Sequence, residues 1–141
     1  MIFPLIFAEI RRRPEMYLPA ATLDAASSFV MGYDAAVNGG LLWAFREWLI
    51  PQLNHGNNLA WPVLVQELID RRSLDSMTDN RPPAVNNQQA AIENLFAIIE
   101  TFLRERDQAN GTRRIFASYE RWINEQEWYD PASPSWIPPT E

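Results

Sequence analysis

The sequence predicts an all-α protein: a single-domain bundle of about six helices over residues 1–141, ending in an irregular, proline-rich tail over residues 129–141. Apolar residues recur at helical spacing in several segments, and no alternating apolar–polar strand of useful length is present. No internal repeat or linker divides the chain, and its 141 residues suit one hydrophobic core.

The composition is typical of a folded, acidic protein. Six Trp, four Tyr and seven Phe supply large side chains for burial, which argues against a disordered chain. The formal net charge is −6, and an acidic surface repels phosphates, so we expect no direct nucleic-acid partner. Attraction to a basic protein partner and solubility alone both explain this charge. The chain has no cysteine, which excludes disulfides and thiolate metal sites.

Residues 4–18 are predicted to form a short buried helix and a loop. Pro4 suits a first helical turn, and the arginines 11–13 suit the helix C-terminus, where the carbonyl dipoles attract cations. Pro14 disfavours a helical conformation at the residue before it and should end the helix. We expect residues 16–18, Met-Tyr-Leu, to tuck the connecting loop onto the core.

This N-terminal stretch does not predict a targeting or membrane segment. Glu9 interrupts the apolar start and the arginines follow it, the reverse of a secretory signal. No apolar run approaches the roughly 18 residues that a membrane span needs. We therefore expect a cytoplasmic protein with no membrane partner.

The second and third helices of the chain are expected between residues 22 and 51. Thr22 is a good N-cap, and Asn38-Gly39-Gly40 ends the helix that follows it. A third, aromatic-rich helix is expected over residues 41–50, with Pro51 kinking or ending it. Residues 54–58, Asn-His-Gly-Asn-Asn, are predicted to form a loop. A neighbouring helix is expected to approach the small residues Ala25, Ala26, Ser28, Gly32, Ala35 and Ala36.

The second half of the chain predicts three further helices. The fourth runs from about Trp61 or Pro62 to Arg72, and a polar surface connection follows over residues 73–84. The longest starts at Asn86 or Asn87 and ends at Gln108, with a clear apolar stripe. Asn110-Gly111 should end it, and Thr112 should cap a last helix running to about Gln126.

The residues offer little catalytic chemistry, so we expect no enzyme, no cofactor and no metal. His55 is the only histidine and lies in the predicted loop with no obvious carboxylate beside it, which favours a solvated role. Glu93 and Glu100 share a helix face at two-turn spacing, where solvation or pairing with arginine is the simpler role. Ion pairs and helix-terminal charge also explain the arginine clusters at 11–13, 71–72 and 113–114.

The run from Asn124 to Asp130 is the strongest candidate for partner contact. It combines acids with two adjacent aromatics, and charge-rimmed aromatic anchors are typical of protein interfaces. The alternative is a helix end with two ordinary packed aromatics. The predicted contact residues are Glu125, Glu127, Trp128, Tyr129 and Asp130, with Asp75 and Asp79 as a second group.

One motif carries a family resemblance. Arg13-Pro14-Glu15-Met16-Tyr17-Leu18 follows an apolar N-terminal segment and precedes Phe29-x-x-Gly32-Tyr33. Over about residues 1–50 this arrangement resembles small helical bacterial proteins with an Arg-Pro-Gly-Met-Tyr-Leu motif, which look like immunity proteins of contact-dependent inhibition and related polymorphic toxin systems. Glu15 and Pro19 stand where glycines are expected, so the loop geometry should differ. The same motif is also similar to a segment of the ATPase domain of type II topoisomerases. This second similarity is local, because no Asn-x-x-Asp box or Gly-rich lid follows in the sequence.

The resemblance implies a non-enzymatic immunity protein. Such a protein would bind a cognate toxin C-terminal domain, here expected to be a basic nuclease, and block its active site or substrate groove with an acidic surface. The first alternative is a structural or regulatory helical module that acts as a homodimer through an exposed aromatic face. The second is a small hydrolase that uses a carboxylate or His55. The motif itself is assigned to the fold, with Tyr17 expected to stabilise it.

Overall fold

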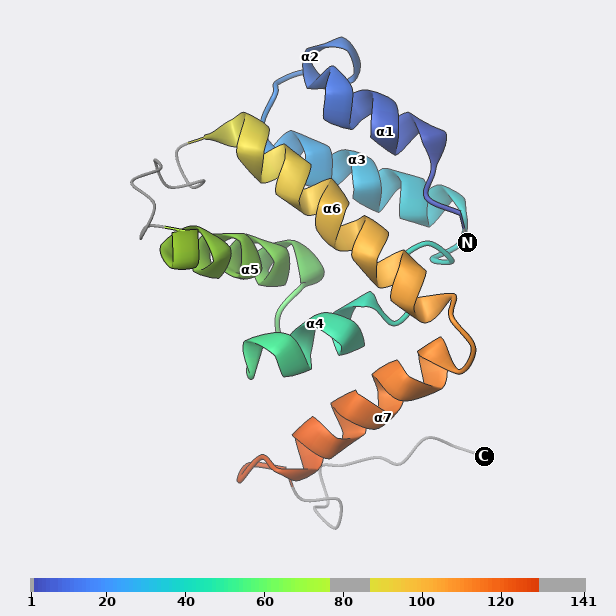
Figure 1. Ribbon diagram of the computed structural model, residues 1–141, viewed down its shortest axis with the longest axis vertical. Helices are drawn as coiled ribbons and strands as arrows, with labels where there is room; N and C mark the ends of the chain where they lie inside the picture. Colours follow the sequence, from blue (N-terminus) through green and yellow to red (C-terminus); the bar gives the residue numbers. More distant parts are fainter. Residues whose placement is uncertain (1, 77–86, 130–141) are drawn as a thin grey trace.

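The computed structural model describes residues 2–76 and 87–129, and the all-α prediction is confirmed within them. Seven α-helices and no strand are present in these ranges (Figure 1). None of the helices is long and apolar enough to cross a lipid bilayer. The helices are α1 (Leu5–Arg12), α2 (Pro14–Tyr17), α3 (Leu23–Ala36), α4 (Phe45–Leu53), α5 (Trp61–Ser76), α6 (Gln88–Arg106) and α7 (Gly111–Asn124).

The long helix α6 organises the packing, because α1, α3, α5 and α7 all pack against it (Figure 1). Helices α1 to α3 lie at its N-terminal half, and α4, α5 and α7 lie at its C-terminal half or beside it. Two aromatic contacts mark these halves. Phe7 meets Phe96 with ring centroids 5.2 Å apart, and Phe45 meets Phe102 at 4.9 Å. All four rings are buried, in one continuous hydrophobic core.

The N-terminal motif differs from the prediction. Pro14 ends α1 as expected, but it also opens the short helix α2, whose first position tolerates proline. Pro14 and Leu18 are one helical turn apart and both face inward. Met16 and Tyr17 therefore fall on the outside of the turn, 63% and 38% exposed. The expectation that these two side chains tuck onto the core is wrong; Leu18, 7% exposed, docks alone.

Helix α3 begins and ends as predicted. The Thr22 hydroxyl accepts a hydrogen bond from the Ala25 amide at 3.2 Å, and Asn38 and Gly39 adopt positive φ of 57° and 77°. The predicted close packing holds at Ala26, which is fully buried, and in part at Ala25, which is half-buried and packs against the core. The outer small residues, Ser28, Gly32, Ala35 and Ala36, are exposed.

Helix α4 starts four residues later than expected and passes through Pro51. Ala44 has a left-handed backbone (φ 74°), and the Asp34 carboxylate accepts a hydrogen bond from the Leu42 amide at 2.9 Å, so residues 41–44 form turns. Pro51 removes one hydrogen bond from the helix, which still continues to Leu53.

The last three helices correct the predicted boundaries in smaller ways. Helix α5 continues to Ser76, four residues beyond Arg72. Asn87 caps α6 by accepting a hydrogen bond from the Ala90 amide at 3.1 Å. Thr112 does not cap α7, because Asn110 (φ 61°) precedes a helix that already starts at Gly111. A Cβ at Gly111 would lie 2.2 Å from the Glu105 carbonyl oxygen, so only glycine fits this close turn.

Candidate partner-binding site

The C-terminal end of α7 presents an exposed tryptophan on a buried one. Trp122 is 7% exposed and Trp128 is 60% exposed, and their rings meet edge to face with centroids 6.3 Å apart. The half-buried Tyr129 also meets the Trp128 ring, with the two ring centroids 6.4 Å apart. Trp128 thus contacts two aromatic neighbours while most of its surface faces solvent, unlike the packed aromatic that the alternative interpretation requires.

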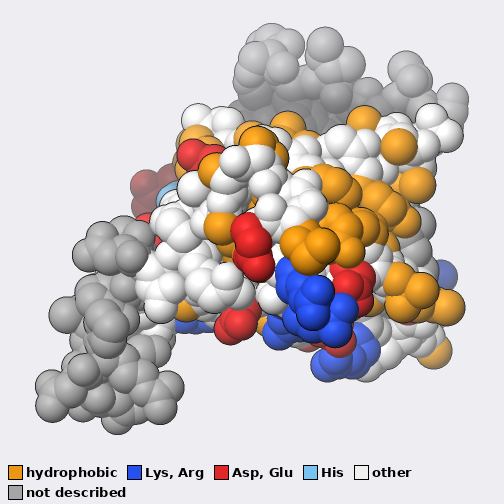
Figure 2. Space-filling view, turned by 90° about the horizontal axis from the view of Figure 1, so that it is seen from above, with side chains coloured by type: hydrophobic (Ala, Val, Ile, Leu, Met, Phe, Trp, Pro, Cys, Tyr) orange, Lys and Arg blue, Asp and Glu red, His pale blue; other side chains and the backbone are white. Residues whose placement is uncertain are grey.

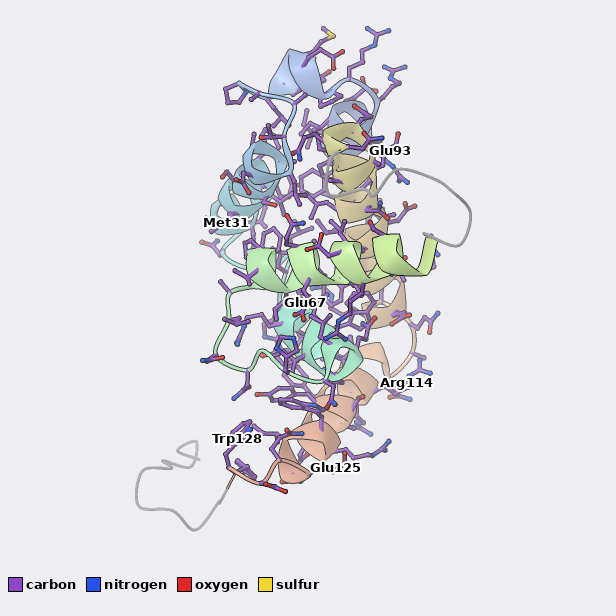
Figure 3. The ribbon with its side chains drawn as sticks, turned by 90° about the vertical axis from the view of Figure 1, so that its left-hand side faces the viewer. Met31, Glu67, Glu93, Arg114, Glu125 and Trp128 are labelled. Carbon is purple, nitrogen blue, oxygen red and sulfur yellow. The ribbon has the colours of Figure 1, made fainter. Side chains whose placement is uncertain are left out.

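Two of the predicted acids flank this tryptophan. Glu125 and Glu127 are exposed, and neither side chain makes a hydrogen bond or an ion pair within the part of the chain that the structure describes. Figure 3 shows Glu125 and Trp128 at the same end of the molecule, beyond the last turn of α7. The carboxylates of Glu125 and Glu127 are therefore available to a cationic group of a partner, because no ion pair with a described residue has to break first.

The remaining predicted residues contribute less. Asp79 and Asp130 lie outside the described residues, as does the side chain of Asp75, whose backbone belongs to α5. Glu93 is exposed, whereas Glu100 forms ion pairs with Arg11 at 3.3 Å and Arg104 at 3.6 Å. The arginine pairing expected for Glu100 is confirmed.

The loop of residues 54–58 supports this end of α7, a contact that the sequence did not reveal. Trp122 Nε1 donates to Asn54 Oδ1 at 2.8 Å, and the Tyr119 hydroxyl donates to Asn57 Oδ1. Arg46 fixes the same loop from α4 by donating to the Asn57 and Leu59 carbonyls at 2.6 and 2.9 Å. Between loop and helix lies a hollow of about 330 Å³ lined by Asn54, His55, Gly56, Asn57, Asn58, Trp122, Gln126 and Trp128.

His55 has a carboxylate neighbour, although the sequence predicted none beside it. Its Nε2 lies 2.5 Å from Glu67 Oε1 on α5, and Arg71 Nη2 reaches the same oxygen at 3.1 Å. Desolvation by burial raises the pKa of Glu67, but the hydrogen bonds and charges of His55 and Arg71 outweigh it, so the pKa lies below its ordinary value. This pair joins a loop to a helix 12 residues further along, a distance over which no local pattern signals contact.

A larger hollow, about 550 Å³, lies between α4, α7 and the end of α6. Trp48 Nε1 donates to Glu105 Oε2 there at 2.5 Å. Tyr119 does not belong to this lining; burial and the charge of the nearby Glu47 carboxylate raise its pKa above the usual value for tyrosine. The lining mixes Glu47 and Glu105 with Arg114, so it presents no single charge to a ligand. Among the described residues, no three His, Asp or Glu side chains come together where they could hold a metal ion.

Comparison with known proteins finds no family model, no curated protein and no solved structure that matches this chain. The resemblance of the N-terminal motif to immunity proteins therefore stays a prediction.

Proposed function

We propose that this protein is a non-enzymatic immunity protein, which binds a cognate toxin domain through the surface formed by Glu125, Glu127 and Trp128. The observation that supports it is the position of Trp128, 60% exposed yet held by Trp122 and Tyr129. An aromatic side chain that is already ordered loses little entropy on binding, and such anchors contribute most of the energy of protein interfaces.

The charge of the protein favours a basic partner, and a nuclease domain is the class we propose. The chain carries a net charge of −6, and no cation among residues 2–76 and 87–129 neutralises the acids beside Trp128. Carboxylates placed over a phosphate-binding groove would occupy it in place of nucleic acid, and they would speed association at low salt. Inhibition would then follow from blocking the groove.

Co-expression tests this proposal. The chain is produced together with the C-terminal toxin module of a secreted protein encoded beside its gene, and co-purification and cell survival are measured. We expect a stable complex and protected cells. Production of both proteins without either outcome would contradict the proposal.

A homodimeric module is the second candidate, because α1, α2 and the residues before α1 expose apolar side chains. Ile2 and Leu5 are 90% and 85% exposed, and Met16 joins them at 63%. Figure 2 looks onto this end and shows hydrophobic side chains next to a cluster of both charge signs. A two-fold pairing would bury the apolar residues and set Arg13 against Glu15 of the second copy. Light scattering of the isolated protein tests it, and a monomer at high concentration would exclude it.

A further inference from the structure

A further depression shares His55 with the hollow of about 330 Å³ described above, which is called the Trp128 hollow from here on. This groove has a volume of about 510 Å³ and runs between the start of α3, the loop before α5, and α5 itself. Its lining consists of Leu23, Asp24, Ser27, His55, Leu59, Pro62, Val63, Gln66, Glu67 and Asp70. We call it the α5 groove.

The α5 groove combines an apolar surface with acidic walls. Leu59, Pro62 and Val63 supply the apolar part, and Val63 is 51% exposed although it is a large hydrophobic residue. Carboxylates come from two elements, Asp24 on α3 and both Glu67 and Asp70 on α5. A surface of this composition fits side chains that are apolar along their stem and positive at their tip.

The acids of the α5 groove are unequally neutralised. Glu67 is paired with His55 and Arg71, so its charge is largely met within the protein. Among the described residues, the Asp70 carboxylate accepts one hydrogen bond, from the neutral amide Gln66 Nε2 at 3.0 Å. The side chain of Asp24, in the first turn of α3, makes no hydrogen bond or ion pair with any described residue. Two carboxylates therefore line the groove without a cation from the described part of the chain, and the apolar walls of the groove strengthen their field.

The groove is continuous with the proposed binding surface. His55 lines both the α5 groove and the Trp128 hollow, so the two depressions meet at one residue. In Figure 3, Glu67 is labelled on the lower side of α5, which is the side towards α7. Trp128 lies further in that direction, near the C-terminal end of α7. A partner anchored on Trp128 would have the α5 groove directly beside it.

We propose that the α5 groove binds a cationic, amphipathic segment of the partner. An Arg or Lys side chain lies between Asp24 and Asp70, and apolar neighbours of that side chain pack on Leu59 and Val63. The inference rests on the proposed function and deepens it, because it names the chemistry of the toxin segment that the protein recognises. Charge complementarity selects this occupant over an acidic or neutral peptide.

The groove is tested with the full chain and a synthetic peptide of alternating Leu and Arg, using isothermal titration calorimetry. The same peptide with Glu in place of Arg, and the small polyamine spermine, are the comparison ligands. We expect the Arg peptide to bind and the Glu peptide not to bind. Absence of Arg-peptide binding, or spermine binding as tightly as the peptide, would overturn the proposal.

Two matched double variants distinguish binding in the groove from the general attraction of a cationic peptide to an acidic protein. Asp24→Asn combined with Asp70→Asn removes two charges inside the groove, while Glu93→Gln combined with Glu120→Gln removes two exposed charges outside it. We expect the groove variant to weaken binding about tenfold, the sum of two partly exposed ion pairs, and the control variant to bind as the unmodified chain. Equal loss in both would overturn the proposal. Thermal unfolding checks that both variants fold.

Binding of the toxin module distinguishes this inference from the proposed function. If the unmodified chain binds the toxin and the groove variant binds it equally well, the groove inference fails and the proposed function stands. If the chain binds the Arg peptide through the groove but not the toxin, the proposed function fails and the groove retains its cationic specificity.

Discussion

The two ends of the molecule expose apolar side chains in different electrostatic settings. At the N-terminal end, Arg11 and Arg12 are paired with Glu100 and Glu9 at 3.3 and 2.7 Å, and the exposed charges that remain, Arg13 and Glu15, have opposite signs. At the C-terminal end of α7, Glu125 and Glu127 beside Trp128 have no such partner among the described residues. Charges that are paired internally contribute to the fold, whereas unpaired ones remain for a partner. This difference is the reason for placing the toxin-binding surface at the C-terminal end of α7.

The largest expected effect separates the two tryptophans of that end. Trp122→Ala should lower the free energy of unfolding by about 3–5 kcal/mol, because it empties a buried site and removes the hydrogen bond to Asn54. Trp128→Ala should lower it by less than about 1 kcal/mol, since most of that ring faces solvent. Urea unfolding of both variants measures this. Equal losses would mean that Trp128 belongs to the core.

The next effect concerns the N-terminal motif. Leu18→Ala should lower the free energy of unfolding by about 2–4 kcal/mol, as for other buried leucines. Tyr17→Ala should cost at most about 1 kcal/mol, because Tyr17 lies on the outer side of α2. Chemical denaturation of the two variants compares them directly. A larger loss for Tyr17→Ala would restore the core-docking role that the sequence suggested.

A smaller effect depends on pH and concerns Glu67, which lies between the two ends. Its pKa is lowered in the folded protein, so its contribution is present above the ordinary glutamate pKa of about 4.3 and is lost as pH falls through the lower folded value. The advantage of the unmodified chain over Glu67→Gln should reach at most about 1 kcal/mol and shrink in that acidic window. Thermal melts at several pH values follow it. An advantage that grew on acidification would contradict the pairing with His55 and Arg71.

The smallest effects on stability are expected for two glutamates: Glu100, which forms two ion pairs, and Glu125, whose side chain is paired with no described residue. Glu100→Gln breaks two ion pairs and should cost up to about 1 kcal/mol, whereas Glu125→Gln should cost nothing measurable. Glu125→Gln should instead slow association with the toxin module at low salt. Stopped-flow binding at two salt concentrations tests this, and an unchanged rate would remove Glu125 from the interface.

Local patterns predicted most of the fold. The cap at Thr22, the positive-φ end at Asn38-Gly39 and the apolar stripe of α6 depend on neighbouring residues, which the sequence displays directly. Pro14 illustrates the limit, because a proline that ends one helix is equally suited to start another. The same ambiguity put Met16 and Tyr17 on the wrong side of the chain.

The candidate site was predictable only where it is contiguous in sequence. Glu125, Glu127 and Trp128 lie within four consecutive residues, so their common position followed from the sequence. The support from Asn54 and the pairing of His55 with Glu67 arise when α4, α5 and α7 pack together. Such contacts depend on tertiary structure and leave no periodic signal in the sequence.

The affinity of the toxin module for two tryptophan variants tests the central claim most directly. Trp128→Ala and Trp43→Ala remove rings of similar exposure, 60% and 56%, from different parts of the surface. The account predicts that Trp128→Ala weakens binding by about 2 kcal/mol or more, roughly thirtyfold, as expected for an interface hot spot, and that Trp43→Ala leaves the affinity unchanged. Unchanged affinity of Trp128→Ala, or a loss confined to Trp43→Ala, would contradict it.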